Sequence, residues 1–205
     1  MHQYGERGVL IDTVDQAPAD VAEDARHAFG ADLIDAVPAA DCVLLTFASP
    51  TAADRVATLL RHRNAAADVA DTARPAGPNP HLVSIDVCYD GPDLADVARH
   101  LGVTVDDVIA LHSQGTFDAG FFGFSPGFAY LTGLHPRLHL PRRATPRTAV
   151  PAGAVAIAAA YTAVYPRTSP GGWHLIGHTD AVMFDPQRTP PTLVSLGAKV
   201  RFRPV

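Results

Sequence analysis

Hydrophobic and polar positions in the first part of the chain follow two different periods. Residues 8–14 alternate with a period of two, which predicts a short strand. Residues 18–29 repeat apolar side chains every three or four positions and stop at a glycine, which predicts a helix. Two further strands and a second helix are predicted for residues 33–37, 42–48 and 50–64. The order strand, helix, strand, strand, helix is most of a split β-α-β unit, with helices on one face of a sheet.

A stretch rich in proline separates this pattern from the rest of the chain. Residues 74–80 contain three prolines and one glycine, a composition typical of a linker. We therefore expect two domains. Residues 1–80 would form a small N-terminal α+β domain of ferredoxin-like arrangement, and residues 81–205 would form the second domain.

The second domain is predicted to begin with one strand and two short helices. The strand covers residues 82–89, and the helices cover residues 93–101 and 104–112. Thr104 is followed three residues later by Asp107, which is the spacing of a capping box at a helix start.

The remainder of the chain is predicted to be all β. Short apolar runs follow one another with proline and glycine turns between them, as in a compact β-barrel or sandwich. The runs are residues 117–124, 154–160, 162–165, 173–176, 181–184 and 200–202. The predicted fold class is therefore α+β, a small α/β-sandwich domain followed by a β-barrel or β-sandwich domain.

Composition excludes several classes of protein. With 205 residues, 47% of them hydrophobic, the chain can bury a core without disulfides. Cys42 and Cys88 are the only cysteines, which fits a reduced, cytoplasmic compartment. Residues 1–15 lack the apolar segment of a secretory signal, and the uncharged run at residues 149–166 is broken by prolines. We therefore expect a cytoplasmic protein with no membrane partner.

Charge is divided unevenly along the chain. Residues 1–118 contain 19 acidic residues and 7 arginines, whereas residues 119–205 contain 2 acidic and 9 basic residues. The basic part could meet an anionic ligand or an acidic partner, or the two parts could simply pair with each other. A nucleic-acid partner is not expected, because the basic residues form no run interleaved with aromatic side chains.

Residues 123–127, Gly-Phe-Ser-Pro-Gly, match the G-x-S-x-G motif of serine hydrolases. In that motif the residue after the serine donates its backbone N–H to the oxyanion. Pro126 has no N–H, so Ser125 is not expected to be a nucleophile.

Phosphate-loop and metal motifs are also missing from the sequence pattern. Lys199 is the only lysine, and it lies outside any Walker A motif. His174 and His178 fall on a predicted strand, where four residues span about 13 Å, too far for one ion. No metal site is therefore predicted.

Two segments could bind a small anion. Gly171 and Gly172 allow a ligand to approach the backbone closely, although a tight turn before a strand explains them equally well. Arg142, Arg143 and Arg147 lie on a proline-stiffened segment and could hold a carboxylate or a phosphate, or form a solvated loop.

Taken together, these segments resemble the family of 5-oxoprolinase B-type subunits, also called allophanate hydrolase subunit 1 or KipI-like proteins. The resemblance covers nearly the whole chain and is most specific between Gly123 and Gly177. It is carried by residues 4–6, 89–94, 111–113, 123–131, 141–147, 150–153, 165–166, 169–173 and 176–177. Ala154, Tyr161 and His178 depart from the family's usual residues.

The resemblance implies a cyclophilin-like barrel for the C-terminal domain. It further implies a protein that acts with A-type and C-type subunits to convert 5-oxoproline to glutamate, with ATP and Mg²⁺ shared among the subunits and no activity of the chain alone. Alternatives within the family are a regulatory module that inhibits a histidine kinase, and a component of a urea or allophanate carboxyl-transfer system.

On this interpretation, site residues can be named. His112 is the candidate catalytic residue, for proton transfer or for orienting the substrate. The arginines would hold the substrate's carboxylate or phosphate, and the glycines would supply backbone amides. The candidate substrate-binding residues are Gly127, Phe128, Tyr130, Arg142, Arg147, Gly171, Gly172 and Trp173.

Overall fold

A computed structural model describes residues 1–13, 16–65 and 81–205, and for residues 60–65 the backbone alone. The chain separates into two compact units, Met1–Asn79 and Pro80–Val205, here called the N-terminal unit and the C-terminal unit. The predicted linker, residues 74–80, lies outside the described residues. Each unit has its own hydrophobic core.

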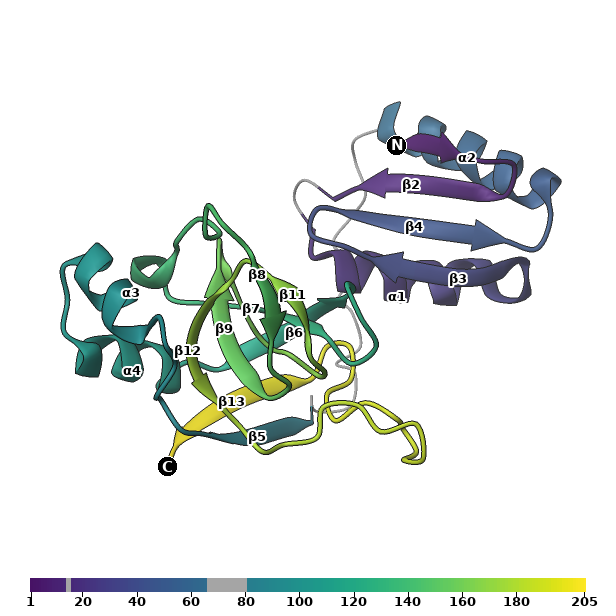
Figure 1. Ribbon diagram of the computed structural model, residues 1–205. Coiled ribbons are helices and arrows are strands. Elements are labelled where there is room, and N and C mark those ends of the chain that lie inside the picture. Colours follow the sequence, from purple (N-terminus) through teal and green to yellow (C-terminus); the bar gives the residue numbers. More distant parts are fainter. Residues whose placement is uncertain (14–15, 66–80) are drawn as a thin grey trace. The chain divides into compact units, whose positions relative to one another are not determined.

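The N-terminal unit is a four-stranded antiparallel sheet with two helices (Figure 1). Its elements are β1 (His2–Tyr4), β2 (Gly8–Asp12), α1 (Pro18–Phe29), a 3₁₀ turn (Gly30–Asp32), β3 (Leu33–Pro38), β4 (Cys42–Phe47) and α2 (Pro50–Ala65). The sheet order is β1-β2-β4-β3. Because β4 lies between β2 and β3, the predicted split β-α-β unit is confirmed. The edge strand β1 was not predicted.

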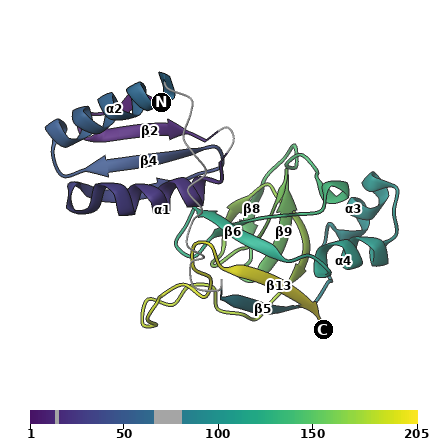
Figure 2. The same cartoon turned by 180° about the vertical axis from the view of Figure 1, so that it is seen from behind.

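Both helices of the N-terminal unit cover the same face of the sheet (Figures 1 and 2). The sheet contributes alternate residues such as Val43, Leu45 and Phe47 to the core, all fully buried. The helices contribute mostly alanines, including Ala22 and Ala53. Small side chains let the helices pack close to the strands.

The C-terminal unit is built around a seven-stranded sheet in the order β12-β9-β10-β7-β6-β13-β5. Its elements are β5 (Leu82–Val87), α3 (Leu94–Leu101), α4 (Val105–Ser113), β6 (Phe117–Phe122), β7 (Ala129–Thr132), a 3₁₀ turn (Pro136–Leu138), β8 (Arg147–Val150), β9 (Ala154–Ala158), β10 (Tyr161–Val164), β11 (Ser169–Gly171), β12 (His174–His178) and β13 (Lys199–Pro204). Strands β8 and β11 form a separate antiparallel pair.

The two edge strands of this sheet approach each other and nearly close it into a barrel. Cys88, directly after β5, and His178, at the end of β12, form an antiparallel bridge with backbone N–H···O distances of 2.9 and 2.8 Å.

Glycine is required next to this closure. A Cβ at Gly177 would lie 2.4 Å from the Cys88 carbonyl oxygen, and one at Gly91 would lie 2.3 Å from that of Leu175. The predicted α+β fold with a C-terminal barrel is confirmed.

Helices α3 and α4 pack against the barrel at β12 and β13 (Figure 1). The predicted capping box is present: Thr104 Oγ1 accepts from the backbone N–H of Asp107 at 3.0 Å, and the Asp107 carboxylate accepts from the backbone N–H of Thr104 at 2.9 Å. Helix α4 therefore begins directly after the predicted capping residue, and α3 begins at Leu94, close to its predicted start.

Residues 181–184 do not form the predicted strand, and that prediction was wrong. Phe184 forms only an isolated bridge with Thr192. The segment instead folds back on the chain that follows it, since the Leu193 N–H donates to the Met183 carbonyl and the Asp185 N–H to that of Pro191. Consecutive prolines at 190 and 191 lack N–H groups, so a regular ladder cannot continue there.

Strand β9 connects two cores of the C-terminal unit, since all of its residues are buried. Val155 and Ile157 belong to the larger core of the barrel. The intervening alanines, including Ala156, belong to a second cluster with Phe128 and Trp173. Alternation along the strand thus separates the two clusters, and the small alanines leave room for large aromatic rings on one face.

Within the described residues, no helix is long and apolar enough to cross a membrane.

Candidate functional site

A small pocket of about 80 Å³ lies beside the aromatic cluster of the C-terminal unit. Three separate stretches of chain meet there: the β6–β7 connection with β7, the segment after Leu140, and the β10–β12 region. The lining residues are Phe124, Phe128, Tyr130, Arg142, Tyr165, Gly171, Gly172 and Trp173. Six of them are among the substrate-binding residues predicted from the sequence, namely Phe128, Tyr130, Arg142, Gly171, Gly172 and Trp173.

The walls of the pocket are aromatic rings packed edge to face. Phe128 lies at the centre, with ring centroids 5.1 Å from Tyr130, 5.2 Å from Tyr165 and 5.6 Å from Trp173. Phe128, Tyr165 and Trp173 are buried, whereas Phe124 is 59% exposed at the rim. Edge-to-face packing holds each ring at a fixed angle, so the shape of the pocket is set by the fold.

The turn between β6 and β7 is in a strained conformation. Phe124 has a φ of +65°, which is uncommon for a residue with a side chain. Gly127 has a φ of +81°, and a Cβ there would lie 2.6 Å from the Phe184 Cβ. Gly127 is not among the pocket-lining residues; it shapes the turn that carries Phe124 and Phe128 into the wall.

The two glycines of the predicted Gly171–Gly172 site differ in surroundings. A Cβ at Gly171 would lie 2.3 Å from the Tyr165 hydroxyl oxygen, whereas one at Gly172 would meet no atom closer than 3.8 Å. Gly171 therefore allows Tyr165 to occupy the pocket wall, and Gly172 leaves the backbone open to a ligand.

Arg142 supplies the positive charge of the pocket. Burial raises the pKa of both Tyr130 and Tyr165, and the nearby Arg142 guanidinium opposes this effect in each case. Both phenols are therefore neutral hydrogen-bond donors at pH 7, close to an exposed cation. Such a set of groups suits a small anion with a flat, partly apolar body.

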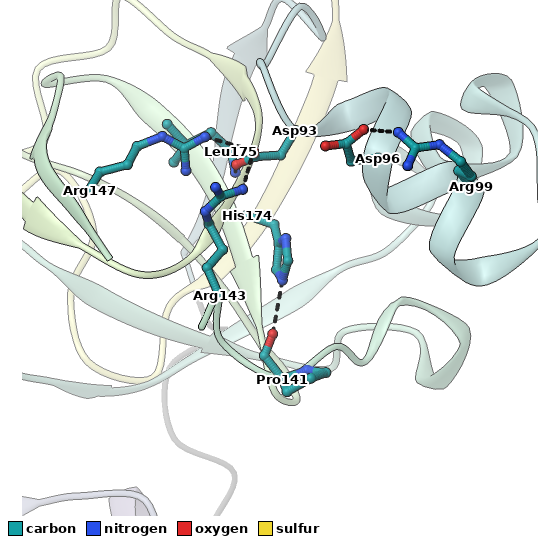
Figure 3. A network of polar contacts seen from close by, with 8 residues as sticks. All are labelled: Asp93, Asp96, Arg99, Pro141, Arg143, Arg147, His174 and Leu175. Atoms are coloured by element: carbon teal, nitrogen blue, oxygen red, sulfur yellow. Dashed lines mark hydrogen bonds and ion pairs between the residues drawn. The ribbon is translucent and has the colours of Figure 1, made fainter. Parts of the chain in front are cut away.

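The neighbouring arginines, Arg143 and Arg147, are engaged elsewhere (Figure 3). Their guanidinium groups each donate to Oδ1 of Asp93 at 2.7 Å. The other oxygen, Oδ2, accepts from the backbone N–H of Leu175 at 2.8 Å. Asp93 is 2% exposed and directly precedes α3, so a buried carboxylate joins the helix, β12 and the arginine segment.

The electrostatics of Asp93 follow from these contacts. Burial by itself would raise the pKa of its carboxyl group, but the hydrogen bonds from Arg147 and Leu175 and the charges of Arg147 and Arg143 outweigh burial and lower it. The carboxylate is therefore charged at neutral pH and holds both arginines in place. Arg147 lies in this network and does not line the pocket.

Further contacts fix the segment that carries Arg142. The His174 ring nitrogen Nε2 lies 2.9 Å from the Pro141 carbonyl oxygen (Figure 3). The Arg143 backbone N–H donates to the Gly172 carbonyl at 2.8 Å. With both neighbours of Arg142 anchored, its backbone is held at the pocket while the side chain remains exposed.

His112, the predicted catalytic residue, lies in the barrel core and not in the pocket. Its Nδ1 is 2.7 Å from the Tyr89 hydroxyl, and its Nε2 is 2.8 Å from Oγ1 of Thr162. Because Thr162 donates its own proton to the Ala156 carbonyl, His112 Nε2–H is the donor to Thr162, and Tyr89 donates to Nδ1.

The surroundings keep His112 neutral. Complete burial lowers its pKa to about 3, and its ring stacks on Phe202 at a centroid distance of 4.7 Å. Both ring nitrogens are occupied within the core, so this arrangement supports a structural role and not direct proton transfer to a ligand in the pocket.

Ser125 is not arranged as a nucleophile either. Its buried Oγ has no hydrogen-bond partner among the described residues, and the chain continues into β7 instead of a helix. An activated serine requires a base within hydrogen-bonding distance.

Sequence reasoning missed Asp93, Phe124 and Tyr165 as contributors to this region. The positive φ of Phe124 had no signal in the sequence. Asp93 had a signal in the sequence: it is an acidic residue within residues 89–94, a segment that carries the family resemblance, and no role was predicted for it.

By its fold, this chain is a carboxyltransferase-like protein whose nearly closed barrel carries a small aromatic pocket. The model of the family "Carboxyltransferase domain, subdomain C and D" matches residues 1–194. The chain belongs to this family, and its resemblance to B-type subunits of 5-oxoprolinase is confirmed by three relatives that carry this name.

Named relatives support this assignment. A protein of Escherichia coli O157:H7, named as the B-type subunit of 5-oxoprolinase, is 46% identical over 130 residues, which are 62% of this chain and 60% of that protein. The protein of the same name from Bacillus subtilis is 42% identical over 127 residues, which are 60% of this chain and 53% of that protein. The matched stretch thus spans little more than half the length of these relatives.

Solved structures share the fold. The crystal structure of TTHA0988 is 35% identical with a TM-score of 0.77, covering 97% of this chain and 40% of that one. PH0987 from Pyrococcus horikoshii is 32% identical with a TM-score of 0.59, covering 98% and 95%. The Kluyveromyces lactis urea amidolyase has a TM-score of 0.70 at 16% identity, covering 100% of this chain and 14% of that one, and shows likeness of fold alone.

Proposed function

We propose that this chain is the B-type subunit of an ATP-dependent 5-oxoprolinase and that the aromatic pocket binds 5-oxoproline. The observation that carries this proposal is the convergence of Arg142 with the aromatic rings around Phe128, in a chain related to proteins named as B-type subunits of 5-oxoprolinase. The substrate is a small flat ring with one carboxylate, and the pocket offers flat apolar walls, one cation and neutral phenols.

In this proposal the parts of the pocket have separate roles. Arg142 pairs with the substrate carboxylate, and the backbone at Gly172 lies open to the ligand. The phenol of Tyr130 donates to a substrate oxygen. Asp93 acts through Arg143 and Arg147, which hold the segment that presents Arg142. It is therefore a positioning residue.

Ring opening needs groups beyond this pocket. A lactam is stable enough that its hydrolysis must be coupled to ATP. We propose that the γ-phosphoryl group passes to the lactam oxygen and ADP leaves; water then adds to the activated carbon, the ring C–N bond breaks, and phosphate is released with glutamate. Transfer of a phosphoryl group requires a phosphate cradle and Mg²⁺. The chain has a single lysine and no Walker A motif. We therefore propose that ATP and Mg²⁺ are bound together with A-type and C-type partner subunits, and that the isolated chain does not turn over.

Binding to the isolated chain can be tested with its own fluorescence. Trp173 is the only tryptophan and lines the pocket, so titration with 5-oxoproline should change its emission. Arg142→Gln should weaken binding roughly 10- to 150-fold, as expected for loss of a charge-assisted contact. Arg167→Gln, an exposed arginine outside the pocket lining, is the matched control and should bind normally.

Turnover requires the assembled system. The chain is co-expressed with A-type and C-type candidates, and ATP-dependent release of glutamate is measured. We expect the assembled complex to be active. Arg142→Gln should reduce its activity, and Arg167→Gln should leave it unchanged. Robust turnover by the chain alone, or no turnover by any assembled complex, would contradict the proposal.

A carboxyl-transfer function is the second candidate, favoured by the family model "Carboxyltransferase domain, subdomain C and D". Its substrate would be urea or a urea-derived amide, and its reaction would depend on biotin. Biotin-dependent activity of the assembled complex on urea, together with no glutamate release from 5-oxoproline, would favour this function over the first.

A further inference from the structure

A second cluster of reactive side chains lies where the barrel closes. Cys88, Asp90 and His178 each offer a ligand atom, and these atoms lie within 4.8 Å of one another. Nδ1 of His178 is 2.7 Å from Oδ1 of Asp90. None of the three residues lines the aromatic pocket, so this cluster is independent of the proposed 5-oxoproline site.

The register of the strands brings these residues to one face. Cys88 and His178 are directly opposed in an antiparallel bridge and exchange both backbone hydrogen bonds. Side chains of directly opposed residues project to the same side of a sheet, with Cβ atoms about 5 Å apart. Asp90 is two residues beyond Cys88, within reach of the same side.

The spacing suits a metal ion of the zinc class. In a tetrahedral zinc site, bond lengths of about 2.0–2.3 Å place neighbouring ligand atoms about 3.3–3.8 Å apart. The present atoms reach this spacing by small side-chain rotations. Two of the side chains are free to make them, because those of Asp90 and His178 are 57% and 50% exposed.

The set of donors is selective. A thiolate, an imidazole and a carboxylate together favour zinc over magnesium or calcium, which prefer oxygen ligands alone. Three protein ligands leave one position of a tetrahedral site open. The cluster borders a hollow of about 440 Å³, which is also lined by Asp86, Thr179 and Asp180. An open coordination position therefore has room for water or a small oxygen ligand.

We propose that Cys88, Asp90 and His178 form a binding site for a divalent cation of the zinc class, located at the bridge that closes the barrel. The ion joins the chain after β5 to the end of β12, beside the backbone bridge between Cys88 and His178. Binding therefore stabilises the folded C-terminal unit as well as filling the site.

Cobalt is the spectroscopic probe for this site. The purified, reduced and metal-free chain is titrated with Co²⁺, which gives a thiolate-to-metal charge-transfer band only where a cysteine is a ligand. We expect this band, its loss on addition of Zn²⁺, and a rise in the thermal unfolding midpoint with Zn²⁺. Cys88→Ser should abolish the band.

Two exposed variants test the other ligands without disturbing the core. Asp90→Asn and His178→Gln should each weaken Zn²⁺ binding by at least roughly 10- to 100-fold. Loss of an outer-sphere partner typically costs this much, and a direct ligand should matter no less. Cys42→Ser removes the other cysteine, which lies in the N-terminal unit, and should change neither the band nor the affinity. His174→Gln, on the same strand as His178, is the control for adventitious histidine binding.

Several results would overturn the proposal. One is Co²⁺ binding without a charge-transfer band, which would mean adventitious binding to histidines. A second is a band that survives in Cys88→Ser or is lost in Cys42→Ser. The third is Zn²⁺ affinity unchanged in both Asp90→Asn and His178→Gln. None of these measurements depends on 5-oxoproline, so they remain decisive whether or not the proposed enzymatic function holds.

Discussion

Nη2 of Arg147 lies 2.7 Å from Oδ1 of Asp93, a carboxylate that is almost completely buried. The two residues are 54 positions apart in the sequence, and Arg143 donates to the same oxygen. The acidic and basic parts of the chain thus meet within the C-terminal unit. Exposed pairs such as Asp86 with Arg203 and Asp118 with Lys199 add to this pairing.

Asp93→Asn should destabilise the C-terminal unit by about 2–4 kcal/mol, because two partly buried guanidinium groups would lose their counter-charge. Asp86→Asn, which breaks a solvent-exposed pair, is the control and should cost less than about 1 kcal/mol. Urea unfolding followed by Trp173 fluorescence measures both. Equal effects of the two substitutions would show that the buried network does not stabilise the fold.

The network also explains which part of the site could be predicted from the sequence. The sequence gives no reason to distinguish Arg142 from Arg147, because both are arginines on a proline-stiffened segment. Only the fold separates them, since Arg147 reaches Asp93 and Arg142 lies at the pocket. Pairing between positions so far apart has no periodic signature in one sequence.

Regular elements were more predictable than short ones. Helix α1 was predicted with its observed ends, because apolar spacing and the terminal glycine agree. Strands β8 and β11 were not predicted, since they have four and three residues and consist largely of Arg, Thr, Ser, Pro and Gly. Such strands form because their partner is present and not because of their own propensity.

Gly171→Ala and Gly172→Ala form a matched pair. A Cβ at Gly171 would collide with the Tyr165 hydroxyl, so Gly171→Ala should displace that ring and weaken 5-oxoproline binding at least tenfold, or about 1.4 kcal/mol. Gly172→Ala has space and should leave thermal stability within about 0.5 kcal/mol of the wild type. Fluorescence titration and thermal unfolding of both variants check this. If Gly172→Ala is the more destabilised of the two variants, the placement of Tyr165 against Gly171 in the pocket wall is wrong.

Ser125→Ala should reduce the activity of the assembled complex by less than about tenfold, because Ser125 has no base and Pro126 cannot donate to an oxyanion. The rate of glutamate release is the measurement. A loss near 10⁴-fold, of the order seen when a true nucleophile is removed, would restore the serine-hydrolase interpretation.

The buried His112 makes stability depend on pH in a defined window. Its pKa is about 3 in the folded state because of burial, compared with about 6.5 in an unfolded chain. Below pH 6.5 the unfolded state therefore binds a proton that the folded state does not. The contribution of His112 to the free energy of unfolding is therefore fully present above this pH, and it is lost as the pH decreases toward 3. Between pH 6.5 and 5, the loss from this residue should be roughly 2 kcal/mol.

His112→Asn should remove this pH dependence while lowering stability at every pH, since it breaks the contacts to Tyr89 and Thr162. His100→Asn, at an exposed position on α3, should keep the dependence of the wild type. Urea unfolding at pH 7, 6 and 5 measures the free energy of each variant. The lowered pKa of Asp93 affects stability only in a more acidic range, near the usual carboxyl values, so it does not mask the effect. If His112→Asn loses as much stability as the wild type between pH 7 and 5, the histidine is not held neutral in the core.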